Sequence, residues 1–136
     1  MKIDNYELAW AAGFFDGEGH AASQLRRRKV QTEGRRTYAS IILDIRQIDR
    51  QVLDRFRAAV GGLGHIYGPY KNKNPNANFF WAFEAAKFED VQAIVAMLWR
   101  YLSPIKRAQT RTALVTWRTR PRKKVGRKTN IERLAA

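Results

Sequence analysis

Residues 11–19 read Ala-Ala-Gly-Phe-Phe-Asp-Gly-Glu-Gly and connect the first predicted helix of the chain to the first predicted strand. Before them, Asp4 and Glu7 have the spacing of a capping box, which predicts a helix from about residue 5 to about residue 15. Two glycines among residues 16–19 favour a turn, so we expect the helix to end there. The stretch therefore predicts a helix that leads through an acidic turn into a strand.

One face of this helix has almost no side-chain bulk. Ala9, Gly13 and Gly17 lie four residues apart, so a second helix backbone could approach closely, as in small-xxx-small pairs. Glu18 follows as a carboxylate, the kind of hard oxygen ligand that suits Mg²⁺. Gly19 allows a close approach of backbone to ligand, and a neighbouring carbonyl could also coordinate.

The chain has 136 residues and is strongly basic, with 26 lysines and arginines against 12 aspartates and glutamates and a formal net charge of +14. A polyanionic partner would relieve this excess, with nucleic acid the first candidate and an anionic membrane the second. No apolar run approaches the roughly 18 residues of a membrane span, and the amino terminus lacks a basic-then-apolar leader. We therefore expect a soluble, intracellular protein that binds nucleic acid, without a membrane or a small-molecule substrate as partner.

Composition also excludes several kinds of site. The chain has no cysteine, which excludes disulfides, thiolate zinc sites, iron–sulfur clusters and a cysteine nucleophile. Its two histidines, His20 and His65, are too few for a histidine-rich metal or nuclease motif.

Sequence periodicity predicts four strands and four helices. Alternation and β-branched residues indicate the strands, and apolar residues at a 3.6-residue period indicate the helices. The expected strands cover residues 20–30, 37–46, 65–71 and 78–84, and the expected helices cover residues 5–15, 50–60, 88–102 and 104–117. The predicted fold class is α+β, with a mixed four-stranded sheet covered by helices. Residues 1–117 form the expected domain, and residues 118–136 form a basic C-terminal extension.

Residues 11–19 resemble the signature motif of the LAGLIDADG homing endonucleases, also called meganucleases. Two alanines, a glycine, two large apolar residues, an aspartate, a small residue, an acid and a glycine follow one another, and Ala11 stands where leucine is usual. The resemblance covers about residues 5–117, including the αββαββα order, and implies the saddle-like sheet of single-motif members. It further implies a site-specific homing DNA endonuclease that acts in intron or intein mobility.

The resemblance also implies a homodimer, because one chain supplies one motif, whereas cutting both strands of a duplex needs two metal–carboxylate centres. A C2 contact through the motif helices is the economical solution. The expected interface residues are Ala9, Gly13, Asp16 and Gly17. Two copies of Glu18 would then lie near the axis and hold Mg²⁺ or another divalent cation, with Gly19 as a further ligand. The substrate would be a long, near-palindromic duplex whose phosphodiester bonds are hydrolysed on both strands.

Two further catalytic residues are implied by the resemblance. Gln47 ends the second expected strand, where the family often has a glutamine that positions solvent near the metal. Lys106 corresponds to a lysine that could stabilise phosphate charge or orient water. For both residues a plain alternative is equally open: a polar residue at the end of a strand, and a solvated basic position on a helix.

We expect one face of the sheet to lie in the major groove, where side chains read base edges while lysines and arginines touch phosphates. The candidates on and beside the strands are His20, Gln24, Arg26, Arg28, Tyr38, Ser40, Asp44, Arg46, Tyr67, Lys71 and Asn78. The extension would follow the DNA backbone without reading sequence. Its candidates are Arg120, Arg122, Lys123 and Lys124.

Two other functions stay open at this point. A non-cutting member of the same fold, either an RNA intron maturase or a DNA-binding regulator, would share every feature above, although Glu18 argues against lost catalysis. A ribosomal-type basic RNA-binding protein fits the charge and size but leaves residues 11–19 unexplained.

Overall fold

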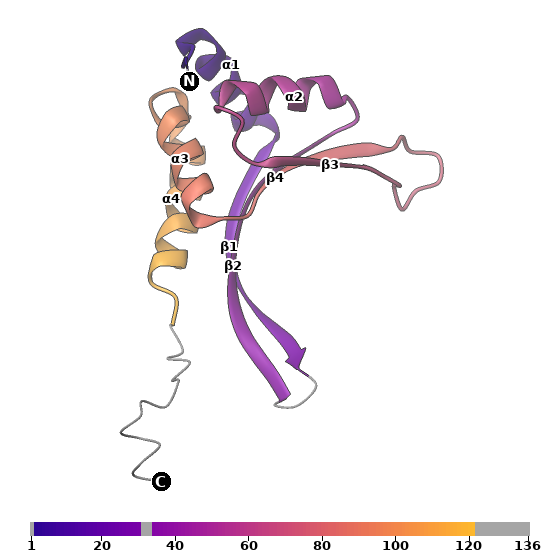
Figure 1. Cartoon of the computed structure of the whole chain (residues 1–136), viewed down its shortest axis with the longest axis vertical. Coiled ribbons are helices and arrows are strands. Elements are labelled where there is room, and N and C mark those ends of the chain that lie inside the picture. The colour runs from indigo at the N-terminus through magenta and orange to yellow at the C-terminus, as the bar shows by residue number, and fades with distance from the viewer. Residues whose placement is uncertain (1, 31–33, 122–136) are drawn as a thin grey trace.

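The computed structural model describes residues 2–30 and 34–121, and for residues 26–30 and 34–37 it describes the backbone alone. All the expected helices and strands are present, in the expected order (Figure 1). Their bounds are α1 Asn5–Glu18, β1 Gly19–Val30, β2 Gly34–Gln47, α2 Arg50–Ala59, β3 His65–Tyr70, β4 Phe80–Ala85, α3 Phe88–Leu98, the 3₁₀ helix η1 Trp99–Tyr101 and α4 Pro104–Arg118.

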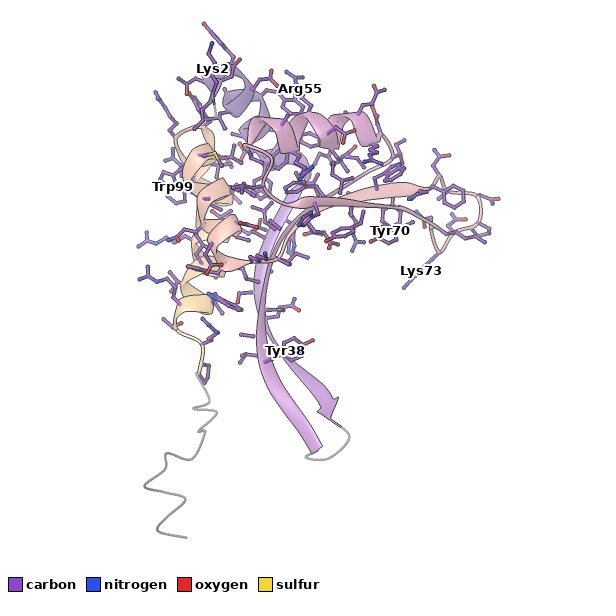
Figure 2. All side chains as sticks on the ribbon, in the orientation of Figure 1. Lys2, Tyr38, Arg55, Tyr70, Lys73 and Trp99 are labelled. Atoms are coloured by element: carbon purple, nitrogen blue, oxygen red, sulfur yellow. The ribbon has the colours of Figure 1, made fainter. Side chains whose placement is uncertain are left out.

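α1 begins as the capping pattern predicts. The Asp4 carboxylate accepts hydrogen bonds from the backbone N–H groups of Tyr6 at 2.9 Å and Glu7 at 3.3 Å. Glu7 takes a different partner from the one a capping box implies, because its carboxylate accepts hydrogen bonds of 3.0 and 2.9 Å from Arg55 of α2. These hydrogen bonds lower the pKa of Glu7 below its ordinary value. Arg55, labelled in Figure 2, also lies 3.8 Å from the centre of the Trp10 ring, so it joins α1 to α2 twice.

The end of α1 differs from the prediction. The helix runs through residues 16–18 and ends at Glu18, so the turn expected at residues 16–19 is wrong. Phe15 is fully buried, and this burial anchors the last turn to the core. Gly17 is tolerated inside the helix, and Gly19 enters β1 at once with an extended backbone. The acid at position 18 is thereby held on a helix end instead of a loop.

The sheet is antiparallel throughout its described pairs, and the expected mixed sheet is wrong. The strand order is β1-β2-β4-β3. α2 carries the chain from β2 to the far edge, where β3 lies, and β4 then returns between β3 and β2. β3 therefore does not pair with β2, because β4 separates them and pairs with both in the antiparallel sense.

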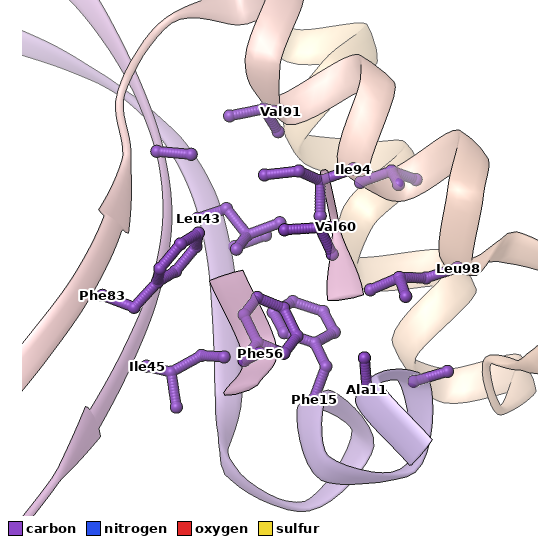
Figure 3. Close-up of a cluster of buried hydrophobic side chains, with 14 of the residues drawn as sticks. Ala11, Phe15, Leu43, Ile45, Phe56, Val60, Phe83, Val91, Ile94 and Leu98 are labelled. Carbon is purple, nitrogen blue, oxygen red and sulfur yellow. The ribbon is translucent and has the colours of Figure 1, made fainter. Parts of the chain in front are cut away.

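The helices cover one face of this sheet and leave the other open. Alternate residues of β2 and β4 point into a core against α1, α2 and α3, as Figure 3 shows. Its fully buried side chains include Phe15, Leu43, Ile45, Phe56 and Phe83. In Figure 1 the β1–β2 and β3–β4 hairpins diverge, and the sheet curves so that its open face is concave.

The junction between α3 and α4 is a defined turn. The expected helix 88–102 ends at Leu98 and tightens into η1. Ser103 is the N-cap of α4, as predicted, and its hydroxyl accepts a hydrogen bond from the backbone N–H of Lys106 at 3.3 Å. Pro104 at the first helical position needs no partner for an N–H group.

α4 runs to Arg118, the first residue of the expected extension. Arg120 folds back on the helix: its guanidinium lies 3.8 Å from the centre of the Trp117 ring and donates a hydrogen bond to the Trp117 carbonyl at 2.6 Å. Arg122, Lys123 and Lys124 lie outside the described residues. None of the described helices is long and apolar enough to cross a membrane.

Candidate functional site

Glu18 and Gln47 meet at the place where the ends of two elements converge. Glu18 is the last residue of α1, and Gln47 is the last residue of β2. Because β1 pairs with β2 from Gly19 opposite Ile45, the helix end is held beside the end of the partner strand. The amide of Gln47 donates a hydrogen bond from Nε2 to Oε2 of Glu18 at 3.1 Å. The structure thus brings together two residues predicted to be catalytic.

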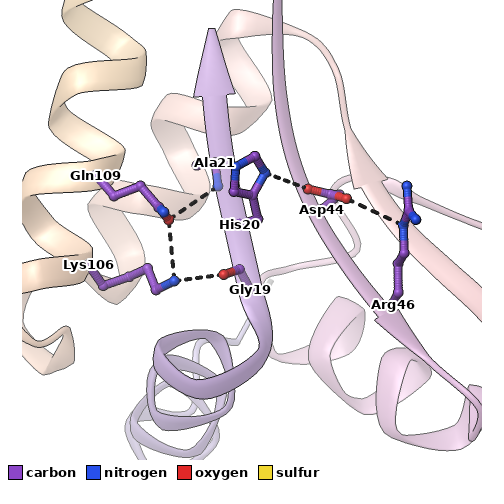
Figure 4. Close-up of polar contacts among 7 residues, drawn as sticks. All are labelled: Gly19, His20, Ala21, Asp44, Arg46, Lys106 and Gln109. Atoms are coloured by element: carbon purple, nitrogen blue, oxygen red, sulfur yellow. Dashed lines mark hydrogen bonds and ion pairs between the residues drawn. The ribbon is translucent and has the colours of Figure 1, made fainter.

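Lys106 reaches the same region from the first turn of α4. Its ammonium Nζ donates a hydrogen bond to the carbonyl oxygen of Gly19 at 2.6 Å, next to Glu18 in the chain (Figure 4). The same Nζ lies 5.3 Å from the centre of the Phe15 ring. Lys106 is half-buried, so the solvated helix position that the sequence left open does not describe it. The ammonium is thus held at the backbone of the residue that follows Glu18.

Asp16, which the sequence predicted for a dimer interface, binds the start of the helix that carries Lys106. Its carboxylate accepts hydrogen bonds from the backbone N–H of Ser103 at 3.1 Å to each oxygen, and from the Ser103 hydroxyl at 3.0 Å. The carboxylate therefore lies at the N-terminal end of α4, where negative charge is favourable. This contact fixes the start of α4 against the end of α1, and Lys106 lies in the first turn of α4.

Gln109 is a site residue that the sequence reasoning missed. Its Oε1 accepts hydrogen bonds from Lys106 Nζ at 3.3 Å and from the backbone N–H of Ala21 at 3.4 Å (Figure 4). The residue lies three positions after Lys106, a spacing that puts both side chains on one helix face. That spacing was visible in the sequence, but the contact with β1 was not.

Glu18 and Gly19, the two predicted metal ligands, are adjacent at the junction of α1 and β1. The Gly19 carbonyl accepts a hydrogen bond from Lys106. Gly19 is needed for packing, since a Cβ there would overlap the ring of Phe15. In the described part of the chain, no cluster of three or more His, Cys, Asp or Glu side chains could hold a metal ion. Mg²⁺ usually keeps several waters and takes only one or two carboxylates, so Glu18 fits the role of a single protein ligand.

The small-residue face of α1 is exposed in the single chain. Ala9, Gly13 and Gly17 are all exposed, and a Cβ added at either glycine would meet no atom within 4 Å. The face is therefore bare backbone that no other part of the described chain covers.

The open, concave face of the sheet carries most of the side chains predicted to contact DNA. By alternation, His20 and Gln24 of β1 lie on the same face as Asp44 and Arg46 of β2. His20 Nδ1 lies 3.2 Å from an Asp44 oxygen, and the other Asp44 oxygen lies 3.9 Å from Nε of Arg46 (Figure 4). The remaining predicted members of this face are Tyr38, Ser40 and Tyr67. Side chains of Arg26 and Arg28 lie outside the described residues.

Two predicted contacts lie beyond the strands. Lys71 and Asn78 fall in the exposed tip of the β3–β4 hairpin, because β3 ends at Tyr70 and β4 begins at Phe80. Arg120 packs on Trp117, which keeps its guanidinium on α4. The hairpin tip extends the open face outward, whereas Arg120 lies where the end of α4 meets β1.

The sequence reasoning also missed residues that share the open face. Glu84 pairs with Asp44 on one side and with His65 on the other, so the row His20, Asp44, Glu84 and His65 crosses all four strands. The alternation of β4 could have identified Glu84, but its neighbours depend on the strand order. Tyr70 and Phe80 of the β3–β4 hairpin lie farther out on the same face.

Solved structures of other proteins share this architecture. The homing endonuclease I-CvuI, in complex with its target in the presence of 2 mM Ca, matches with a TM-score of 0.64 and 22% identity over 84% of this chain and 67% of that chain. The I-SmaMI LAGLIDADG homing endonuclease bound to cleaved DNA matches with a TM-score of 0.52 and 19% identity over 74% of this chain and 30% of that chain. The chain has the fold of the LAGLIDADG homing endonucleases.

A third structure with this fold, the archaeal intron-encoded homing endonuclease I-Vdi141I complexed with DNA, matches with a TM-score of 0.54 and 21% identity over 71% of this chain and 56% of that chain. The present chain thus spans about two thirds of I-CvuI and a smaller share of the other two. No family model and no curated protein matches the sequence. In this LAGLIDADG fold, residues 11–19 form the end of α1 and the first residue of β1.

Proposed function

We propose that the chain is a LAGLIDADG homing endonuclease, which hydrolyses phosphodiester bonds on both strands of a specific DNA duplex as a homodimer with a divalent metal. The convergence of Glu18, Gln47 and Lys106 carries the proposal. These residues come from α1, β2 and α4, and they meet next to an exposed small-residue helix face and an open, curved sheet. Glu18 and Gln47 are joined by a hydrogen bond, and Lys106 contacts the carbonyl of Gly19, the next residue after Glu18.

Each residue has a part in phosphodiester hydrolysis. Glu18 would hold Mg²⁺, which when bound supplies an activated water and stabilises the leaving oxygen. Gln47 orients the Glu18 carboxylate through its 3.1 Å hydrogen bond and would position the attacking water. Lys106 stands ready to donate to the phosphate oxygens on which negative charge develops. Its present acceptor, the Gly19 carbonyl, holds the ammonium in place before DNA arrives.

A second copy of the chain would complete the site. The bare face of α1 at Ala9, Gly13 and Gly17 allows the two α1 helices to approach closely about a C2 axis. Glu18 ends the same helix, so the axis would bring the two carboxylates together, one for each strand of the duplex.

The open face would bind DNA in the major groove. Its two hairpins diverge around a concave surface that would receive a duplex (Figure 1), and the net charge of +14 would supply sequence-independent attraction to phosphates. His20, Gln24 and Arg46 would read base edges, and Lys71 in the hairpin tip would touch the backbone. Residues 118–136 would add backbone contacts.

The proposal is tested with a duplex selected by the purified protein from a random-sequence pool. Wild type is expected to cut the selected duplex in Mg²⁺ but not in EDTA, while Glu18→Gln binds it and does not cut. Lys106→Met should lose about 10²-fold in cleavage rate, the usual cost of one charge-stabilising donor. Glu89→Gln, which changes an exposed acid of α3, is the matched control and should cut normally.

Equal cutting by wild type and Glu18→Gln would contradict the proposed site. Tight duplex binding by both without cutting would instead support a non-cutting DNA-binding regulator of the same fold. A preference for structured RNA over the duplex would support an RNA maturase or a ribosomal-type protein.

A further inference from the structure

An aromatic strip lies on the open face of the β3–β4 hairpin. We define it as Tyr67, Tyr70 and Phe80. Tyr67 and Arg46 both pair with Ala82, so Tyr67 lies on the same face as Arg46, which is the face of the predicted DNA contacts. Phe80 is two residues from Ala82 and lies on that face as well, with the Arg46 guanidinium 5.7 Å from its ring centre.

Tyr70 reaches this face only because β3 is irregular. Tyr70 is three positions after Tyr67, so a regular strand would point the two rings to opposite faces. The pairing with β4 shifts between Tyr67 and Tyr70, and Gly68 has a φ of 133°, which favours glycine. Tyr70 is thereby turned onto Phe80, with ring centroids 5.5 Å apart, and Figure 2 shows it on the concave side of the hairpin.

The strip leaves apolar surface on a face that is otherwise charged and polar. Tyr67 is 44% exposed and Tyr70 is 41% exposed. The ring carbons, unlike the tyrosine hydroxyl groups, have no favourable contact to make with phosphates. In the major groove, the C5-methyl group of thymine is the feature of a base pair that offers an apolar contact.

Ring packing favours a duplex over single-stranded bases as the ligand. A platform for unpaired bases needs open ring faces on which they can stack. Phe80 already has Arg46 over its ring and Tyr70 against it, and Tyr67 has the His65 ring at 6.1 Å. The ring edges remain accessible to a ligand, and a ring edge is large enough to pack against a methyl group.

We propose that the aromatic strip determines sequence specificity by packing against thymine methyl groups in the part of each half-site that lies under the β3–β4 hairpin. The inference rests on duplex binding by the open face, as in the proposed function, but not on cleavage. Trp81, the chain neighbour of Phe80, pairs with Gln47, and Gln47 is hydrogen-bonded to Glu18. The selected thymines should therefore lie in the part of each half-site nearest the bonds that are cut.

The first test measures how wild type binds duplexes in which thymine methyl groups have been removed. A duplex selected by wild type from a random pool is resynthesised with single thymines replaced by deoxyuridine, which removes only the methyl group. Wild-type affinity at fixed salt should fall about fourfold at one or more thymines next to the cleaved bonds in each half-site, the factor expected for one buried methyl. Thymines elsewhere in the duplex should tolerate the replacement.

Variants then connect the methyl effect to the strip. Tyr67→Ala and Phe80→Ala should bind the thymine and deoxyuridine duplexes equally, whereas Tyr67→Phe, which keeps the ring, should retain the difference. Phe79→Ala is the matched control, because Phe79 is 60% exposed next to Phe80 but lies outside the strip. The variants need only bind for this comparison, and the wild-type measurement needs no variant at all.

Equal affinity of wild type for thymine and deoxyuridine at every position would overturn the inference while leaving the endonuclease proposal intact. Tighter binding to unpaired bases than to the duplex, lost in Tyr67→Ala, would also overturn it, in favour of a stacking platform. Loss of cleavage with the methyl effect retained would contradict the proposed function alone.

Discussion

Replacing Asp16 tests how the end of α1 and the start of α4 are joined. Its carboxylate accepts hydrogen bonds from Ser103 N at 3.1 Å to each oxygen and from Ser103 Oγ at 3.0 Å. A hydrogen bond to a charged group contributes about 1.5–3 kcal/mol, and a charge near a helix N-terminus adds about 0.3–1 kcal/mol. Because the contact is half-buried and water replaces part of it, we expect Asp16→Ala to lower the free energy of unfolding by about 2–3 kcal/mol.

Urea unfolding followed by tryptophan fluorescence measures this loss. Asp16→Asn keeps one oxygen acceptor but not the charge, and it should lose about 1 kcal/mol. Asp54→Ala removes a 53% exposed carboxylate on α2 and should change stability by no more than about 0.5 kcal/mol. The loss in Asp16→Ala should be independent of protein concentration, because the contact lies within one chain. A loss below about 0.5 kcal/mol, or one seen only where dimers dissociate, would refute the reasoning.

Three further changes have defined outcomes. Hydrogen bonds from Arg55 lower the pKa of Glu7, so this pair stabilises the fold at pH values above the ordinary glutamate pKa of 4.5 and loses that effect as the pH falls below it. In urea unfolding midpoints measured over a pH series, Glu7→Gln should therefore lose less stability on acidification than wild type. Gly13→Ala should raise the stability of the single chain by about 0.5–1 kcal/mol, because a methyl there meets nothing, yet weaken self-association measured by sedimentation velocity. Gly19→Ala should destabilise by about 1–3 kcal/mol, since its methyl would overlap the Phe15 ring, and thermal unfolding that matched wild type would contradict this packing.

Local patterns predicted much of the fold. Helix caps at Asp4, Asp49 and Ser103 were readable because a cap involves residues within three positions of one another. Strand alternation likewise predicted the two faces of β1 and β2. The meeting of Glu18 with Gln47 followed from a family resemblance, not from any local signal.

What the sequence did not reveal depends on contacts between distant residues. The turn expected at residues 16–19 is a helix because Phe15 is buried in tertiary packing that local glycine propensity does not register. Asp16 and Ser103 are 87 positions apart, so no spacing rule joins them. The direction of β4 depends on where α2 carries the chain, and the orientation of Tyr70 depends on an irregular strand that breaks the two-residue period.

The central claim is that two copies of the chain each cut one strand through their own Glu18. Its most direct test is a mixed dimer of wild type and Glu18→Gln, purified through two different tags and incubated in Mg²⁺ with a supercoiled plasmid that carries the selected site. Wild-type dimers should produce linear DNA, the doubly substituted dimer should leave the plasmid supercoiled, and the mixed dimer should accumulate the nicked circle. Linear product from the mixed dimer at the wild-type rate would contradict the account.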